Sequence, residues 1–191
     1  MSPSTVSPAA PDEAVFKLAP FNPSSVEIQE MALRLLKLTG EDVLFDLGCG
    51  DGRLLLTAAE RVEGLRCVGI EMDPVFVKRA QTATPATLQD RIDIRLQDAL
   101  QLSRTPTRTT SSKEIPTSEL SLLDDCTALY LFVLPKGVVK LLPLITSLIQ
   151  TRQAQGRPLR ILSYMFQLYE WPPTAIDKTA KAGCPVYLYE F

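Results

Sequence analysis

The chain has 191 residues, of which 46% are hydrophobic. This length is enough for one buried core and too short for two comfortable ones. Its 20 basic and 22 acidic residues leave a formal net charge of −2, which gives no overall electrostatic reason to expect nucleic acid as a generic partner. The chain contains no histidine, which excludes Ser-His-Asp and Cys-His catalysis.

The cysteines are widely spaced and form no CxxC pair, so we predict neither a zinc site nor any other metal site. They are interpreted as reduced, mostly buried residues of an intracellular protein. No apolar run is long enough to span a membrane. The four positions are Cys49, Cys67, Cys126 and Cys184.

The first residues are rich in Pro, Ser and Ala and contain no Arg or Lys before Lys17. This pattern fits neither a secretory signal nor a mitochondrial presequence. We therefore expect a flexible leader at 1–15, a single domain at 16–191, and a cytoplasmic location, with mitochondria as the alternative.

The first ordered element is expected to be a helix that begins at Ser24. Ser24 and Glu27 have the spacing of a capping box, apolar residues follow at helical intervals, and Gly40 is the expected stop. Asp73 and Pro74 have the pattern of an N-cap and first turn of a later helix. Helices are predicted from Ser24 and at 53–62, 73–83 and 137–150; strands are predicted at 43–48, 66–70, 92–96, 126–134, 160–166 and 186–191.

Strands that alternate with helices favour βαβ units and a parallel sheet covered on both faces. Residues 103–118 interrupt this pattern with Ser, Thr and Pro and only one large apolar residue, Ile115. A core strand cannot be made from that composition, so we predict a disordered surface insertion there.

The motif DLGCGDGR, residues 46–53, follows the first apolar strand. Glycines in the first strand-to-helix turn of such a sheet let the backbone approach a ligand closely. A dinucleotide fingerprint would place its third glycine at position 53, where the chain has Arg53, and the GxxxxGK[ST] phosphate loop is absent. The pattern therefore does not match either common phosphate-binding loop.

Two aspartates, Asp46 and Asp51, lie in this turn. Carboxylates repel a pyrophosphate but attract a sulfonium and an ammonium group. The charge of the turn therefore disfavours NAD or ATP and favours a cationic nucleoside, S-adenosylmethionine.

Two further acidic positions follow the next two strands. Glu71 lies about 20 residues beyond the glycines, the spacing at which nucleotide-binding folds carry a ribose-binding acid. Asp98 is a candidate acceptor for the adenine amino group, and the amide of Ala99 a candidate donor to the ring. The structural alternatives are a tight turn for the glycine motif, a helix-capping acid for Glu71 and an ordinary strand-end turn residue for Asp98.

DLGCGDGR (46–53), GIEMD (69–73) and QDA (97–99) resemble the motifs of class I S-adenosylmethionine-dependent methyltransferases. The resemblance covers the chain from Phe21 onward. It implies an α/β, Rossmann-like fold with helices on both faces of a mostly parallel seven-stranded sheet of order 3-2-1-4-5-7-6, here with an abbreviated C-terminal hairpin. The implied cofactor-binding residues are Asp46, Gly48, Cys49, Gly50, Gly52, Glu71, Met72, Asp98 and Ala99.

A narrower resemblance rests on FNPSSVEIQEMAL, DLGCGDGR, LYLFVLP and ILSYMFQLYEW. These segments are similar to a family of compact protein-lysine methyltransferases that modify the ADP/ATP carrier and the ATP synthase c subunit. The resemblance implies a protein substrate whose lysine is methylated.

The acceptor is expected beside the end of the fourth strand. Candidates there are Tyr130, Phe132 and Pro135, with Phe21 and Asn22 as a cover from the opening segment. Core packing is the alternative for the two aromatic residues, and helix initiation for the proline. No general base is assigned. The fourth strand ends in VLPKG and lacks the acidic or amide group typical of enzymes that methylate base nitrogens, so nucleic acid ranks second. A small-molecule or RNA methyltransferase and a catalytically silent cofactor-binding subunit remain alternatives.

Overall fold

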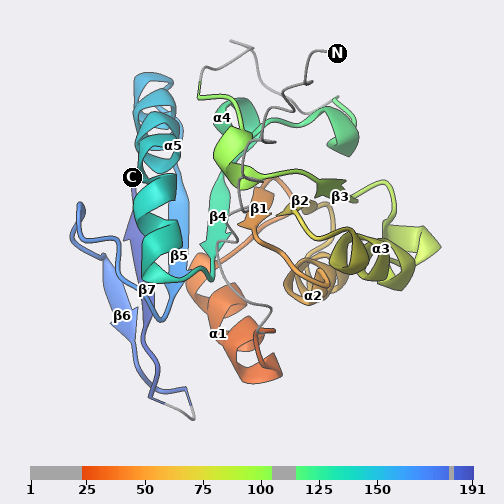
Figure 1. Ribbon diagram of the computed structural model, residues 1–191, viewed down its shortest axis with the longest axis horizontal. Coiled ribbons are helices and arrows are strands. Elements are labelled where there is room, and N and C mark those ends of the chain that lie inside the picture. The colour runs from red at the N-terminus through yellow and green to blue at the C-terminus, as the bar shows by residue number, and fades with distance from the viewer. Residues whose placement is uncertain (1–22, 105–114, 181–182) are drawn as a thin grey trace, which may run out of the picture.

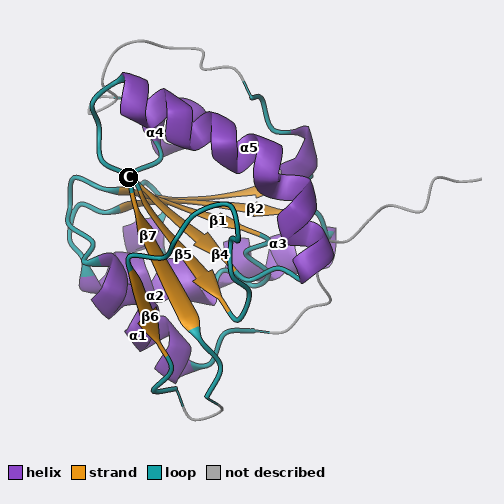
Figure 2. Ribbon diagram, turned by 90° about the vertical axis from the view of Figure 1, so that its left-hand side faces the viewer, coloured by secondary structure: helices purple, strands orange, loops and turns teal. Residues whose placement is uncertain are grey.

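A computed structural model describes residues 23–104, 115–180 and 183–191. The predicted leader, Phe21 and Asn22 lie outside the described residues. A seven-stranded sheet of order β3-β2-β1-β4-β5-β7-β6 crosses the described part of the molecule, and Figures 1 and 2 show helices on both of its faces. The sheet order and the two helical layers agree with the class I methyltransferase fold that the sequence predicts.

The first five strands of the sheet are parallel, and β7 is antiparallel to both β5 and β6. Both strands of the C-terminal hairpin are present, and β6 is its short member. The strands are β1 (Val43–Leu47), β2 (Arg66–Glu71), β3 (Ile92–Leu96), β4 (Ala128–Leu131), β5 (Arg160–Tyr164), β6 (Ala175–Asp177) and β7 (Val186–Glu190).

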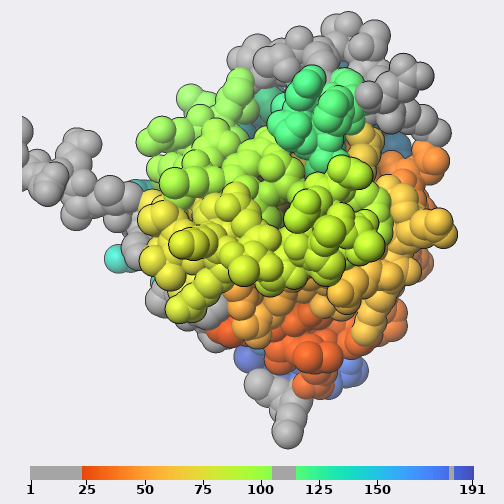
Figure 3. Space-filling model, turned by 90° about the vertical axis from the view of Figure 1, so that its right-hand side faces the viewer, coloured from red at the N-terminus to blue at the C-terminus, as the bar shows by residue number. Residues whose placement is uncertain are grey.

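The helices divide between the two faces because each strand directs alternate side chains to opposite sides. In β1, Leu44 packs with α1, α2 and α3, whereas Phe45 packs with α4 and α5. Figure 2 shows this layering. Figure 3 shows the face of the molecule beyond β3, where α3 and the residues that follow it, in yellow and yellow-green, form much of the surface. The α-helices are α1 (Val26–Leu36), α2 (Arg53–Arg61), α3 (Pro74–Ala83), α4 (Leu122–Asp125) and α5 (Pro135–Ala154).

The ends of α1 differ from those that the sequence predicts. Ser25, not Ser24, is the N-cap, and its side chain accepts a hydrogen bond from the Ile28 amide. The helix ends at Lys37 in a left-handed conformation, three residues before Gly40. Two adjacent serines both satisfy the N-cap preference, and Ser24 is instead drawn to another partner, described below.

The boundaries of β4 and α5 also differ from the prediction. The apolar run 126–134 contains a strand of only four residues, β4, and the chain then turns into α5 at Pro135, the first position of that helix. Proline is well suited to this position because its missing N–H has no helical acceptor there. Pro143 lies inside α5 without ending it.

The predicted insertion at 103–118 divides into two parts. Residues 105–114 lie outside the described residues. In contrast to the prediction, 115–118 pack on the sheet: Arg66 donates to the Ile115 carbonyl, Arg95 donates to the Thr117 carbonyl, and the Thr117 hydroxyl donates to the Asp90 carbonyl. Backbone carbonyls are the acceptors in all three of these contacts, so composition alone gives no sign of them.

No helix within the described ranges has the length and hydropathy needed to cross a membrane.

Candidate functional site

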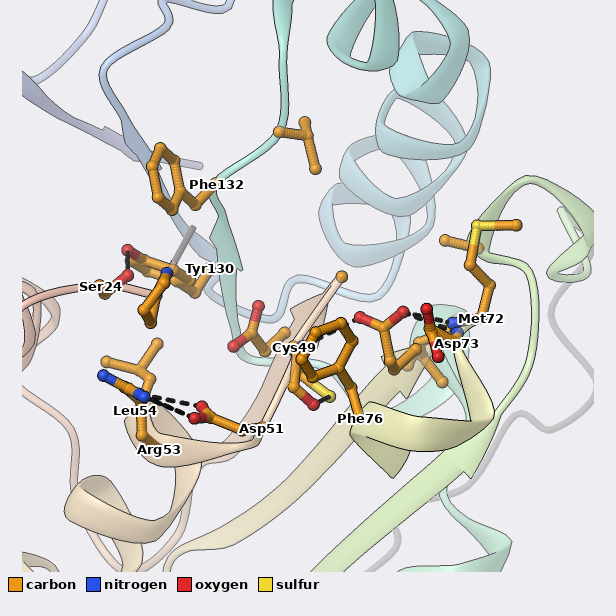
Figure 4. Close-up of a pocket in the computed structure, with 18 of the residues that line it drawn as sticks. Ser24, Cys49, Asp51, Arg53, Leu54, Met72, Asp73, Phe76, Tyr130 and Phe132 are labelled. Carbon is orange, nitrogen blue, oxygen red and sulfur yellow. Dashed lines mark hydrogen bonds and ion pairs between the residues drawn. The ribbon is translucent and has the colours of Figure 1, made fainter. Parts of the chain in front are cut away.

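A pocket of about 410 Å³ lies where the carboxyl ends of β1, β2 and β4 meet (Figure 4). This is the edge at which open α/β sheets bind ligands. Five acidic side chains line it, together with apolar and aromatic ones. The lining residues are Pro23, Ser24, Asp46, Gly48, Cys49, Gly50, Asp51, Arg53, Leu54, Ile70, Glu71, Met72, Asp73, Phe76, Gln97, Asp98, Ala99, Tyr130, Phe132 and Val133.

The glycine turn forms the floor of the pocket. Gly48 has φ +89°, a conformation that side chains disfavour, although a Cβ there would meet only Val133 at 3.8 Å. Its amide donates to the Ile70 carbonyl at 2.8 Å, which holds the turn against the end of β2. Gly52 has a different role. A Cβ at Gly52 would lie 3.0 Å from that of Ala80, so this glycine lets α2 pack against α3.

Asp46 is the deeply buried acid of the site. Its burial and then the negative charge of Glu71 raise the pKa of Asp46 to about 8. An unliganded pocket therefore holds Asp46 mostly protonated at neutral pH. A bound cation would favour the carboxylate, because an opposite charge nearby lowers the pKa of an acid.

Asp51 has a partner that the sequence interpretation did not weigh. Arg53 contacts its carboxylate through Nε at 2.9 Å and through Nη2 at 2.5 Å, and this lowers the pKa of Asp51. The ion pair offsets the charge of Asp51. The glycine turn is therefore less negative than its two aspartates indicate. Glu71 adds a further acidic group to the pocket.

Glu71 lies at the end of β2, as predicted, and its carboxylate bridges two segments. One oxygen accepts the Gly50 amide at 3.0 Å, and the other accepts the amides of Met72 and Asp73, both at 2.8 Å. These bonds fix the carboxylate between the glycine turn and the start of α3. Carboxylate oxygens retain further acceptor capacity for ligand hydroxyls.

Asp98 and Ala99 lie together at the pocket wall, beyond the end of β3. The Asp98 carboxylate accepts the Leu100 amide at 2.9 Å and caps a short 3₁₀ helix. Asp98 therefore has a local structural role after β3, in line with the strand-end alternative from the sequence, and the same side chain also lines the pocket.

Aromatic residues line the opposite end of the pocket. The Tyr130 hydroxyl is hydrogen-bonded to the Ser24 hydroxyl at 2.7 Å, which joins β4 to the segment before α1 (Figure 4). The Phe132 ring contacts the Tyr164 ring, with centroids 4.6 Å apart. Tyr130 is both a core residue and a pocket residue, so the two interpretations of its role are compatible.

Most of the predicted site residues therefore meet at one pocket. Gly52 and Pro135 do not line it, and Phe21 and Asn22 lie outside the described residues. The sequence analysis assigned no site role to several lining residues, although all of them except Leu54 and Phe76 lie within the quoted motifs and segments. For Arg53 the sequence did contain a signal: it lies two residues after Asp51, at the start of a predicted helix, where the two side chains can form an ion pair. The missed residues are Pro23, Ser24, Arg53, Leu54, Ile70, Asp73, Phe76, Gln97 and Val133.

Within the described ranges, no three or more acidic or cysteine side chains are grouped as metal ligands would be.

The amino-acid sequence is similar to those of known methyltransferases. A family model described as a methyltransferase domain matches residues 44–112. A protein-lysine N-methyltransferase of Saccharolobus islandicus is 33% identical over 61 residues, 32% of this chain and 38% of that protein. A probable cobalt-precorrin-6B C(15)-methyltransferase of Pyrobaculum aerophilum is 32% identical over 97 residues, 50% of each chain. The matched region thus spans half or less of these curated relatives.

Solved structures share the fold over more of the chain. An RNA methyltransferase from Salinibacter ruber, in complex with S-adenosyl-L-homocysteine, has 27% identity and a TM-score of 0.65, covering 88% of this chain and 93% of that one. A methyltransferase from Geobacter sulfurreducens in complex with the same compound has 21% identity and a TM-score of 0.53, covering 80% and 53%. Together with the sheet order and the pocket, these matches support a class I, S-adenosylmethionine-dependent methyltransferase domain in this chain.

Proposed function

We propose that the chain is a methyltransferase that takes S-adenosylmethionine as its cofactor and transfers the methyl group to a protein lysine. The observation that carries the cofactor assignment is the acidic character of the pocket, whose lining has five acidic side chains and one arginine. Acidic groups in this excess attract a cationic nucleoside and repel a pyrophosphate. S-adenosyl-L-homocysteine in the similar solved structures agrees with this cofactor.

Residues of three strand ends would hold the cofactor. Glu71 can accept hydrogen bonds from ribose hydroxyls, and Asp98 can accept one from an adenine amino group. The ionised form of Asp46 would attract the positive charge of the cofactor. When bound, S-adenosylmethionine supplies an activated methyl group on a sulfonium. The chain's contribution is then to position a neutral nucleophile against that group and to exclude water.

A binding titration tests this assignment. Asp46→Ala and Glu71→Ala should each lower the affinity for S-adenosylhomocysteine, measured by calorimetry, by about tenfold or more, because each removes a polar group aimed into the pocket. Glu30→Ala, which removes a surface acid paired with Arg61, is the matched control and should bind normally. Unchanged affinity in both pocket variants would contradict the cofactor site.

The acceptor end of the pocket supports lysine as the methylated group. Tyr130 and Phe132 line this end of the pocket with rings against which an alkyl chain can pack, and the Ser24 hydroxyl is hydrogen-bonded to that of Tyr130. Aromatic faces also attract an ammonium group before it loses its proton. The short similarity to a protein-lysine N-methyltransferase agrees with this acceptor.

RNA is the second candidate acceptor, because a solved structure that covers 88% of this chain is named an RNA methyltransferase. Against it, the chain after β4 reads FVLPKG and offers no acid or side-chain amide to a base amino group. The cobalt-precorrin relative leaves a small-molecule acceptor as a further alternative.

Transfer of labelled methyl groups from S-adenosylmethionine into cell extract separates these acceptors. A lysine methyltransferase should give label that protease removes and nuclease does not, with methyl-lysine recovered after acid hydrolysis. Glu71→Ala provides the inactive control. Nuclease-sensitive label would favour RNA, and label in the low-molecular-mass fraction a small molecule. If the cofactor binds but no fraction is labelled, a catalytically silent subunit is favoured.

A further inference from the structure

The charged groups of the pocket are unequally divided. Asp46, Asp51, Glu71, Asp73 and Asp98 carry carboxylates, and Arg53 is the one basic residue among the lining residues that the structure describes. The proposed cofactor, however, ends in an amino acid that carries a carboxylate as well as an ammonium. A carboxylate placed among acids alone would be repelled. Arg53 is thus the candidate partner for that group.

The guanidinium of Arg53 is only partly engaged. Its Nε and Nη2 donate to Asp51, while no hydrogen bond from Nη1 to another described residue is found. In Figure 4 the ion pair lies on the Ser24 and Tyr130 side of the pocket, away from Met72 and Asp73. An arginine carries five N–H donors in a planar fork that suits carboxylates. Donors therefore remain for a second carboxylate while Asp51 holds the fork in place.

The stability of α2 gives no reason for an arginine at this position. A cation in the first turn opposes the helix dipole, and an ion pair whose arginine is 43% exposed contributes little to folding. Moreover, the N-cap of α2 is Gly52, which has no side chain to cap the helix. Its first backbone N–H groups have no side-chain acceptor and face the same turn, which adds a second attraction for an anion.

We propose that Arg53 binds the carboxylate of the cofactor's amino-acid end, with Asp51 as a positioning residue that orients the guanidinium. The proposal rests on the proposed function, since it assigns a further residue to the same site. It divides the pocket into an anionic region for the nucleoside and sulfonium and a cationic point for the carboxylate.

Paired ligands test this assignment. S-adenosylmethionine and its decarboxylated form both carry the sulfonium and the ammonium, and only the first has the carboxylate. The wild-type protein should bind the intact compound about 10- to 100-fold more tightly, the usual range for a charge-assisted hydrogen bond. Arg53→Gln should lose most of this preference while keeping its affinity for the decarboxylated compound. Asp51→Asn should lose part of the preference.

Two controls complete the experiment. Arg61→Gln removes an arginine from the other end of α2, where it pairs with Glu30, and should keep the full preference. Glu71→Gln should weaken both ligands alike. Equal binding of the two ligands by the wild-type protein, or an equal loss for both in Arg53→Gln, would overturn the role of Arg53 and leave the proposed function intact. A wild-type protein that binds neither ligand would overturn both.

Discussion

At the scale of single residues, the sequence predicts which side chains reach the pocket better than it predicts their charges. Asp46 and Glu71 lie at the carboxyl ends of β1 and β2, whose apolar pattern is plain, and the carboxyl ends of parallel strands share one edge. The protonation of Asp46 depends on complete burial, and the charge of Asp51 depends on how Arg53 folds back toward it. Neither property follows from spacing along the chain.

The raised pKa of Asp46 predicts that cofactor affinity depends on pH. Because a sulfonium favours the ionised carboxylate, binding must remove the proton that Asp46 carries below pH 8. Affinity for S-adenosylmethionine should therefore rise between pH 6 and pH 8, by up to about tenfold per pH unit, and level off above. Calorimetry in buffers of different ionisation enthalpy would also detect the proton released.

Asp46→Asn is the reference for this measurement, because the α-amino group of the cofactor titrates in the same range. The variant should bind more weakly and retain only the shallower dependence that belongs to the ligand. If the wild-type protein and Asp46→Asn gave parallel profiles, Asp46 would not be the titrating group.

At the scale of elements, hydrophobic pattern and capping residues predict the existence of the main helices and strands, and their ends less well. Asp73 and Pro74 begin α3 as expected, because Asp73 suits the N-cap and Pro74 suits the first helical position. Ser24 and Ser25 are equivalent in sequence, and the Tyr130 hydroxyl, far along the chain, distinguishes them by binding Ser24. The three residues of β6 have no strand pattern of their own, and pairing with β7 defines them.

The packing of β2 under the glycine turn depends on Gly69. A Cβ there would lie 2.6 Å from Cys49 Sγ, 2.8 Å from Ile94 Cδ1 and 2.9 Å from Leu55 Cδ1. Gly69→Ala should therefore lower the free energy of unfolding by about 1–3 kcal/mol, the usual cost of overpacking. It should also weaken cofactor binding, because Cys49 lines the pocket. Urea denaturation measures the first effect and calorimetry the second.

A second substitution tests the cause of that loss. Ile94→Val removes the Cδ1 atom and alone should cost about 0.5–1.5 kcal/mol. In the double variant it makes room for the new methyl group, so the combined loss should be smaller than the sum of the single losses. Strict additivity would mean that the contact with Ile94 does not cause the destabilisation.

At the scale of the whole molecule, the two ends of the sheet have separate roles. The carboxyl ends of the strands carry the pocket, whereas Asp42, just before β1, organises the opposite end. Its carboxylate accepts hydrogen bonds from the Thr39 amide at 2.8 Å and the Thr127 hydroxyl at 2.7 Å, and it forms an ion pair with Arg160. Arg160 also donates to the Lys37 carbonyl at 3.0 Å, so this group joins α1, β1, β4 and β5.

This separation predicts a variant that loses stability without losing the site. Arg160→Met leaves Asp42, whose side chain is only 9% exposed, without its cationic partner; breaking a buried ion pair in this way typically costs about 3–5 kcal/mol, and the hydrogen bonds from Thr39 and Thr127 that remain place the cost toward the lower end. Arg34→Met is the matched control, since Arg34 is 61% exposed in its pair with Asp177 and should contribute at most about 1 kcal/mol. Urea denaturation should separate the two variants clearly.

At a temperature where both remain folded, both should bind S-adenosylhomocysteine as the wild-type protein does, because neither side chain reaches the pocket. A loss of affinity in folded Arg160→Met would show that the two ends of the sheet are coupled.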